Sequence, residues 1–390
     1  MVKGCKLVSR LVGTVGSLLL VSALLPFPLY AQLSTADHLT EPGFWPTQPA
    51  SSRADFVGTG ACATCHAGKA ASQQSTAMGN TLRRADASEV LRTHPKMNFA
   101  VSHYHYEVQT NTAGSTYSVT DGERTSTARL LWSFGTGKVG QSYLFKKDDG
   151  KFYEARVTYF DTLQNLNFTP ARALASPKDL DQAMDRPVDA AEVGRCFGCH
   201  ATAANIGTVF DEKTLMPSVT CEACHGAGAK HVAVAEAARV AGMPESARGS
   251  IFNGAQLTPA DSVDFCGACH GTFWDVKLSG AKGVTTVKSQ PYRLEGSKCW
   301  GTGDARLTCI ACHNPHEPVQ RGASAYDSAC LGCHSGNGVV GTAAHPKGAC
   351  PVSSKDCVSC HMPKVYVPDM HYKFTDHRIR ISREGEAYPE

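Results

Sequence analysis

The sequence lacks an excess of charge of either sign. Lysine and arginine together number 38, and aspartate and glutamate number 35, in a chain of 390 residues. The three surplus basic residues are Lys3, Lys6 and Arg10, all within the first 31 residues. Since the rest of the chain is balanced, a strongly basic nucleic-acid-binding protein is excluded.

Long apolar runs are equally scarce, and the single clear one lies at the start. An uncharged run from Leu11 to Pro26 follows the three basic residues, and Ala31 offers a small residue before Gln32. This order is typical of an export signal, so we expect cleavage after Ala31. A retained membrane anchor is the alternative, because the uncharged run is just long enough to span a bilayer if its helix is tilted. We expect the mature chain to be soluble in the periplasm or the extracellular space.

Cysteine and histidine, by contrast, are abundant, at 17 and 16 residues. Fourteen of the cysteines belong to seven copies of Cys-x-x-Cys-His, the attachment signature of c-type haem. Two thiols three residues apart form thioethers with the two vinyl groups of one porphyrin, and the adjacent histidine ligates its iron. Zinc knuckles and redox disulfides also use Cys-x-x-Cys, but neither requires a histidine after every second cysteine. The sequence therefore predicts seven covalently attached haem c groups.

We number these motifs 1 to 7 in chain order. They are Cys62-Ala-Thr-Cys65-His66, Cys196-Phe-Gly-Cys199-His200, Cys221-Glu-Ala-Cys224-His225, Cys266-Gly-Ala-Cys269-His270, Cys309-Ile-Ala-Cys312-His313, Cys330-Leu-Gly-Cys333-His334 and Cys357-Val-Ser-Cys360-His361.

The chain supplies little polypeptide for each haem. Motifs 2 to 7 share the 166 residues from Cys196 to His361, or about 28 residues each. So short a segment cannot bury an apolar core around every macrocycle, so the porphyrins themselves must form the core. We expect a multihaem cytochrome c fold: mostly short α-helices and irregular loops wrapped around closely packed haems, with a small antiparallel β subdomain. Haems packed this closely form an electron path.

The β subdomain is predicted where the haem motifs are missing. Residues 99–168 alternate Val, Tyr, Phe and Thr, with turn signals at Asp121-Gly122 and Asp149-Gly150. The segment from Gly135 to Gly140 formally matches a dinucleotide-binding fingerprint, but it separates two strand-like runs and precedes no helix, so we interpret it as a hairpin turn. The predicted organisation is a signal peptide (1–31), a linker (32–57), a first haem segment (58–98), a β-rich subdomain (99–170), a six-haem domain (171–380) and a C-terminal tail (381–390).

Residues outside the motifs are candidates for the second axial ligand of each iron, since His and Met serve in this position. His316 cannot reach the far side of the haem at His313, because the macrocycle stands between them, so it should ligate a neighbouring haem. The same reasoning applies to His231, which follows His225 through a glycine-rich turn. The remaining candidates are His345, His371, His377, one of the pair His103 and His105 (for which we take His103), and Met78. His38 is expected to be solvated.

Two further cysteines of the mature chain, Cys299 and Cys350, belong to no motif. In an oxidising compartment they could pair in a disulfide, or remain as two thiols. The sequence does not decide between these alternatives.

Several runs resemble a known family, the multihaem cytochromes of the cytochrome c-554 and doubled-CXXCH type. The similarity lies in residues 58–66, in the run from Cys221 to His231, in Cys309-Ile-Ala-Cys-His-Asn-Pro-His316, and in residues 357–363 with the trailing Thr375-Asp-His377. It extends through most of residues 58–380. The resemblance implies an electron carrier of the periplasm with mostly bis-histidine haems.

The resemblance also includes enzymes, namely the ammonia-forming nitrite reductases and the hydroxylamine oxidoreductases. Catalysis would require an iron with an open position, which the nitrite reductases obtain with a lysine in place of the motif histidine. All seven motifs here end in histidine. Electron transfer is therefore favoured, with a reductase or oxidase of small nitrogen compounds as one alternative and a subunit of an extracellular cytochrome filament as another.

The expected partners are redox proteins that donate and accept electrons. Two propionates on each haem, set against about one positive charge on ferric iron, make the charge-balanced chain negative, which favours basic partner surfaces. A membrane-associated complex and the oligomeric state stay open.

Overall fold

The structure is a computed structural model, and it describes residues 52–170, 177–206, 209–244, 251–300, 306–334, 350, 352–383 and 385–389. Contacts within the chain divide it into Met1–Ser34 and Thr35–Glu390. Every described residue belongs to the second unit. The predicted export signal, His38 and His345 lie outside the described residues.

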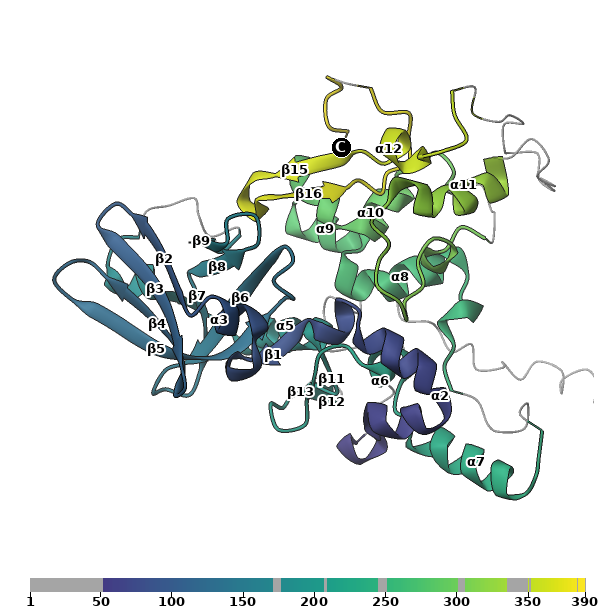
Figure 1. Cartoon of the computed structure of the whole chain (residues 1–390), viewed down its shortest axis with the longest axis horizontal. Helices are drawn as coiled ribbons and strands as arrows, with labels where there is room; N and C mark the ends of the chain where they lie inside the picture. Colours follow the sequence, from purple (N-terminus) through teal and green to yellow (C-terminus); the bar gives the residue numbers. More distant parts are fainter. Residues whose placement is uncertain are drawn as a thin grey trace, which may run out of the picture. The chain divides into compact units, whose positions relative to one another are not determined.

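A ten-stranded antiparallel sheet occupies the first half of the described chain (Figure 1). Its strand order is β10-β7-β6-β5-β4-β3-β2, with β1 beside β5 and the β8–β9 hairpin beside β6. The strands are β1 (Leu82–Arg84), β2 (Lys96–Val101), β3 (Tyr104–Asn111), β4 (Gly114–Thr120), β5 (Thr125–Phe134), β6 (Gly140–Lys146), β7 (Phe152–Ala155), β8 (Val157–Phe160), β9 (Asn165–Phe168) and β10 (Asp185–Pro187).

Alternating side chains explain how the central strands form. In β4, Ser115, Tyr117 and Val119 are buried while their neighbours are partly exposed, as expected for a strand with one face on a core. The predicted turns are confirmed: Gly122 and Gly150 have φ of 95° and 74°, values that glycine adopts without strain. Residues 135–139 join the paired strands β5 and β6, so the interpretation of this segment as a hairpin turn is also confirmed.

The prediction of a small β subdomain was wrong in extent. The sheet begins at Leu82 and takes in Asp185–Pro187, well outside residues 99–170. Both added strands have three residues and no alternating pattern. They are strands because they pair with β5 and β7, and no local sequence signal marks them. The fold is therefore a mixture of a large antiparallel sheet and short helices.

The helices are mostly short, as predicted. They are α2 (Gly58–Gln74), α3 (Glu89–Thr93), α4 (Leu180–Met184), α5 (Ala190–His200), α6 (Cys221–His225), α7 (Ala229–Val240), α8 (Pro259–His270), α9 (Phe273–Ser279), α10 (Gln290–Glu295), α11 (Asp327–His334) and α12 (Cys357–His361), followed by the hairpin of β15 (Lys364–Val367) and β16 (Tyr372–Thr375). Within the described ranges, none of these helices has the length and apolarity needed to cross a bilayer.

Aromatic packing attaches the sheet to motif 2. Phe197, inside the motif, is fully buried and its ring contacts those of Trp132, Phe134 and Phe152 from the sheet. Phe134 also packs edge-on against the ring of His200, with centroids 5.2 Å apart. The sheet therefore positions the motif 2 histidine directly.

A carboxylate joins the sheet to the turn at residues 212–214, which follows motif 2 in the chain. Glu212 accepts hydrogen bonds from Trp132 Nε1 at 2.8 Å and Lys146 Nζ at 2.6 Å, and Arg84 lies 3.5 Å away. Burial raises the pKa of Glu212, but hydrogen bonds from Lys146 and Trp132 and the nearby positive charges outweigh it, so the pKa lies below its usual value. The folded state therefore favours the ionised form.

Replacing Glu212 by glutamine is expected to lower the free energy of unfolding by about 1–3 kcal/mol at neutral pH, because two donors lose a charged acceptor. A lowered folded-state pKa stabilises the fold above the unfolded pKa and loses that contribution as pH falls through the folded value. The gap between wild type and variant should thus narrow on acidification in urea titrations. Glu107→Gln, which removes a pair with exposed Lys96, is the control and should cost less than about 1 kcal/mol. Equal losses in the two variants would contradict the prediction.

Candidate haem-binding sites

The motifs share a local conformation. In motifs 2, 3, 4, 6 and 7 the helix ends at the motif histidine, as in α5, α6, α8, α11 and α12. Motif 1 lies within α2, which kinks at His66, and motif 5 forms a short 3₁₀ turn over Cys309–Ala311. Cysteines three residues apart on one helical turn lie on the same face, as attachment to one porphyrin requires.

Thiols from different motifs approach each other in pairs. The Cys62 thiol is hydrogen-bonded with that of Cys221, which joins motifs 1 and 3. In motifs 2 and 4, Cys199 Sγ lies 3.5 Å from the Ala268 carbonyl oxygen and Cys269 Sγ lies 3.7 Å from that of Cys199. Two more pairs of thiols are Cys266 with Cys309, from motifs 4 and 5, and Cys330 with Cys357, from motifs 6 and 7.

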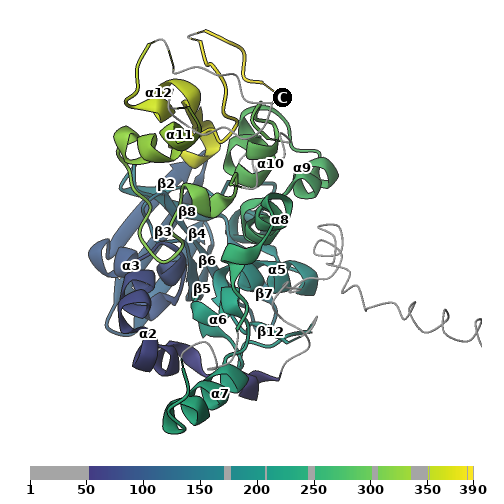
Figure 2. The ribbon, with the colours of Figure 1, turned by 90° about the vertical axis from the view of Figure 1, so that its right-hand side faces the viewer.

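Longer-range electrostatic interactions between thiols relate these pairs to one another. Cys224 of motif 3 lies within electrostatic range of Cys266 and Cys269 of motif 4. Cys312 of motif 5 likewise lies within electrostatic range of Cys333 of motif 6. The spatial order is therefore 1–3–4–5–6–7, with motif 2 beside motif 4. Both ribbon views show α6, α8, α11 and α12 succeeding one another in this order (Figures 1 and 2).

Backbone carbonyls orient several imidazoles. The Nδ1 atoms of His225 and His361 donate to the carbonyl oxygens of Phe252 at 2.7 Å and Arg380 at 3.0 Å. His200 Nδ1 lies 2.7 Å from Thr81 Oγ1 and 3.3 Å from the Thr81 carbonyl oxygen. Metal-ligating histidines characteristically donate one ring N–H to such an acceptor, which presents the other nitrogen to the metal. These residues therefore fit haem iron.

Two pairs of histidine rings have centroid separations close to those of two imidazoles on one iron atom. The rings of His225 and His316 have centroids 5.9 Å apart and planes within 4° of parallel. The rings of His313 and His377 have centroids 6.2 Å apart at 37°. Two imidazole nitrogens that each bind a metal at about 2 Å place their ring centroids about 6 Å apart. His316 thus lies opposite the histidine of motif 3, and His377 lies opposite that of motif 5.

The protonation of these rings also suits ligation. Burial lowers the pKa of His377 to about 4, even though its Nδ1 donates to the Thr375 carbonyl oxygen at 3.1 Å. Burial likewise lowers the pKa of His313 and of His316. Because only neutral imidazole binds a metal, these histidines need release no proton near pH 7.

The other predicted axial ligands that lie within the described residues are not paired in this way with a motif histidine ring. His231 has a buried Nδ1 atom with no hydrogen-bond partner among the described residues, as a side chain that binds a haem iron could have. His371 packs its ring edge-on against Phe160, with centroids 4.8 Å apart. Met78 is partly buried at the start of a 3₁₀ turn. Residue His345 lies outside the described residues.

The pair His103 and His105 is exposed on the β2–β3 hairpin. The His103 ring packs against that of Tyr104 at a tilt of 39°, and in the part of the chain that the structure describes neither His103 nor His105 contacts a motif histidine ring. Cys299 and Cys350 form no disulfide in the described residues. Cys299 instead lies within electrostatic range of Cys312 and Cys333, in motifs 5 and 6.

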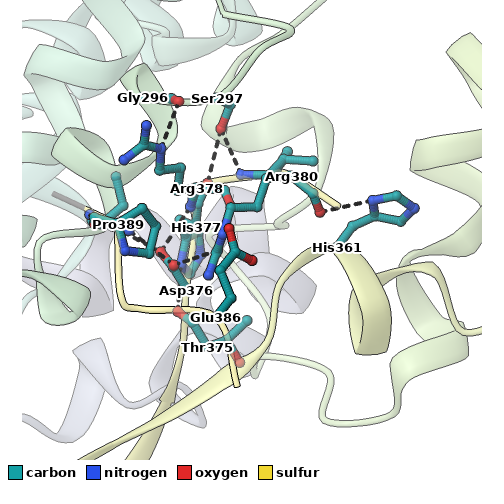
Figure 3. Close-up of polar contacts among 12 residues, drawn as sticks. Gly296, Ser297, His361, Thr375, Asp376, His377, Arg378, Arg380, Glu386 and Pro389 are labelled. Atoms are coloured by element: carbon teal, nitrogen blue, oxygen red, sulfur yellow. Dashed lines mark hydrogen bonds and ion pairs between the residues drawn. The ribbon is translucent and has the colours of Figure 1, made fainter. Parts of the chain in front are cut away.

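A buried ion network surrounds His377 (Figure 3). Asp376 is fully buried, and its two carboxylate oxygens accept from Arg293 Nε at 2.9 Å and Nη2 at 3.0 Å, while Arg380 Nη1 lies 2.8 Å from Oδ2. The Arg380 backbone N–H donates to the His361 carbonyl oxygen at 3.1 Å, in addition to the His361 Nδ1 contact. One short segment thus holds a ring opposite motif 5 and supports motif 7.

Sequence reasoning missed Asp376, Arg293 and also Glu222, whose contacts are described below. Each also has a partner 83 to 165 positions away in the chain, so no spacing pattern marks these contacts. The acidic residue inside motif 3 was the one local signal available, since the second position of the other six motifs is uncharged.

The repeated motif, the oriented histidines and the facing ring pairs define a multihaem c-type cytochrome, a class that binds haem c covalently and transfers electrons. Within this class, residues 158–226, which contain motifs 2 and 3, match the family of cytochrome c554 and c-prime. Among solved structures, the outer cell wall cytochrome OcwA is similar, with a TM-score of 0.45 and 14% identity over 84% of this chain and 80% of that chain. No curated protein matches the chain.

Proposed function

We propose that the chain is an exported electron-transfer protein that holds seven haem c groups in one continuous array. The observation that carries this proposal is the proximity of the motif thiols: motif 1 pairs with motif 3, motif 2 with motif 4, motif 4 with motif 5 and motif 6 with motif 7, while motifs 3 and 4, and motifs 5 and 6, interact electrostatically at longer range. Haem c, when bound, supplies iron that cycles between its ferrous and ferric forms. The fourteen motif cysteines tether the array, and the motif histidines bind one axial position each.

The chain also supplies second axial ligands in a regular way. His316 follows motif 5 and lies opposite the histidine of motif 3, and His377 follows motif 7 and lies opposite that of motif 5. By the same offset, His231, which follows motif 3, would ligate iron at motif 1. The hydrogen bond between the Cys62 and Cys221 thiols and the unpartnered Nδ1 of His231 support this assignment.

Location and partners follow from the predicted export signal and from charge. We propose a periplasmic or extracellular location, for which the order of basic and apolar residues in 1–31 is the support. Redox proteins that present basic surfaces are the proposed electron donor and acceptor. Comparing binding of the holoprotein to basic and acidic redox proteins over a range of salt concentrations tests this, because charge-driven association weakens with salt.

The haem count is tested on the purified holoprotein. Intact-mass spectrometry should give the mass of the polypeptide without residues 1–31 plus seven haems. Replacing Cys196 and Cys199 together by alanine should remove one haem and leave six, because both thioether bonds of motif 2 are lost. A wild-type mass with fewer than seven haems would contradict the proposed count.

Catalysis at an open iron is the second candidate function. Among the described residues, only the motif 3 and motif 5 histidines face another histidine ring at ligand spacing. Quantitative electron paramagnetic resonance of the oxidised protein separates the two functions. A spectrum with all haems low-spin identifies a carrier, whereas a full equivalent of high-spin signal identifies an open iron and calls for assays with nitrite and hydroxylamine.

A further inference from the structure

Glu222, the second residue of motif 3, makes contacts that attachment of haem to its own motif does not require. Its side chain is buried, with 1% of the residue exposed. One carboxylate oxygen accepts from the backbone N–H groups of Val57 and Gly228, each at 2.8 Å, and the other accepts from Gly58 N–H at 2.7 Å. A single carboxylate therefore accepts hydrogen bonds from three backbone N–H groups, in residues 57–58 and in residue 228, two segments that are far apart in the sequence.

These donors belong to the starts of two helices. Val57 and Gly58 begin α2, which carries motif 1 from Cys62 onward, and Gly228 precedes α7, in which His231 is the third residue. The first N–H groups of a helix have no partner within it, and the helix dipole favours a negative charge there. The carboxylate thus meets the positive ends of α2 and α7 together.

Side chains crowd the backbone at Gly228. A Cβ atom at Gly228 would lie 3.1 Å from the nearer Glu222 oxygen and 3.1 Å from Val57 Cγ2. Gly58 has φ of +79°, a conformation that other residues rarely adopt. Both glycines permit the close approach that brings three N–H groups to one carboxylate.

We propose that Glu222 is a positioning residue that holds motif 1 against motif 3 and aims His231 at the iron of motif 1. The inference rests on the proposed function, in which His231 is the second axial ligand at motif 1. Cys221 is adjacent to Glu222 and its thiol contacts that of Cys62, so any shift of α2 relative to Glu222 changes the separation of the two motifs. A shift of α7 moves His231 instead.

The test compares Glu222→Gln with wild type in the purified holoprotein. Glutamine offers one oxygen in place of two, and its NH₂ group would face an N–H donor, so the three contacts cannot all persist. We expect all seven haems to stay attached by mass spectrometry, and about one haem equivalent to change from low to high spin by electron paramagnetic resonance. We also expect weaker magnetic coupling between the irons of motifs 1 and 3.

Glu236→Gln is the matched control, because Glu236 lies on the same helix as His231 but is exposed and, among the described residues, pairs with Arg239 alone. It should leave the spectrum unchanged. Glu222→Asp is the milder variant if the glutamine variant fails to fold, since it keeps the charge but cannot reach all three donors. It should give a smaller high-spin signal at the same field position.

His231→Ala separates failure of the inference from failure of the proposed function. If His231→Ala produces the high-spin signal and neither Glu222 variant does, the positioning role is overturned while ligation by His231 stands. If His231→Ala leaves the spectrum unchanged, ligation by His231 is overturned. In that case the magnetic coupling decides the positioning role, because a Glu222 variant that leaves the coupling intact does not move motif 1.

Discussion

Replacing His377 by alanine is expected to convert one haem equivalent from low to high spin. The ring of His377 faces that of His313 at 6.2 Å between centroids, the spacing of two imidazoles on one iron. Alanine offers no donor atom, so the iron of motif 5 would keep only one strong protein ligand. Quantitative electron paramagnetic resonance of the oxidised holoprotein measures the change, and the open iron should also bind carbon monoxide when reduced.

The control for this experiment is His105→Ala, because His105 is exposed on the β2–β3 hairpin. Its spectrum should match that of wild type. If His377→Ala also matches wild type, the facing rings are a packing contact and not an axial pair, and the ligand offset proposed for His231 loses its second example.

Replacement by methionine extends the same prediction to the reduction potential. A thioether in the second axial position raises the potential of a c-type haem relative to bis-histidine ligation. His377→Met should therefore keep the iron low-spin if the thioether reaches it, and should shift one component of a potentiometric titration upwards while the others stay in place.

The covalent part of the site could be predicted from the sequence because its chemistry is local. Two thioethers and one proximal ligand come from five consecutive residues, so spacing alone identifies them. Ligation of a neighbouring haem by His316 stays a prediction, made because its own macrocycle blocks it; the His316 ring centroid lies 5.9 Å from that of His225. The motif that His316 approaches depends on the position of α6 relative to the turn after motif 5. The spacing of residues in the sequence does not predict this position.

In the fold, too, features with a local sequence signal were predictable and features that depend on long-range pairing were not. Strands with alternating side chains, such as β3 and β4, were predictable, whereas β1 and β10 became strands only by pairing with β5 and β7. The buried ion pairs were the hardest feature to predict from the sequence. Asp376 looks like an ordinary polar residue beside a candidate ligand, and its role depends on Arg293, which is 83 positions away.

Replacing Asp376 by asparagine is expected to cost about 3–5 kcal/mol of unfolding free energy, the cost of removing one partner from a buried ion pair. Asp376 is 0% and Arg293 1% exposed at the side chain, so the guanidinium of Arg293 would stay buried without its carboxylate partner. Arg380 would lose the same partner. Guanidinium chloride titration of the oxidised holoprotein measures the loss. Glu236→Gln, which breaks an exposed pair with Arg239, should cost less than about 1 kcal/mol.

The double variant Asp376→Asn/Arg293→Met distinguishes a loss of charge balance from a loss of shape. Methionine removes the stranded charge while filling part of the arginine volume, so the double variant should recover part of the stability lost by Asp376→Asn alone. Because the Asp376 backbone N–H still donates to the Pro363 carbonyl oxygen at 2.9 Å, the segment can keep its path. We therefore expect His377 to remain a ligand in the double variant, with a low-spin spectrum. Additive losses in the two single variants and the double variant would show instead that the ion pair contributes no coupling energy.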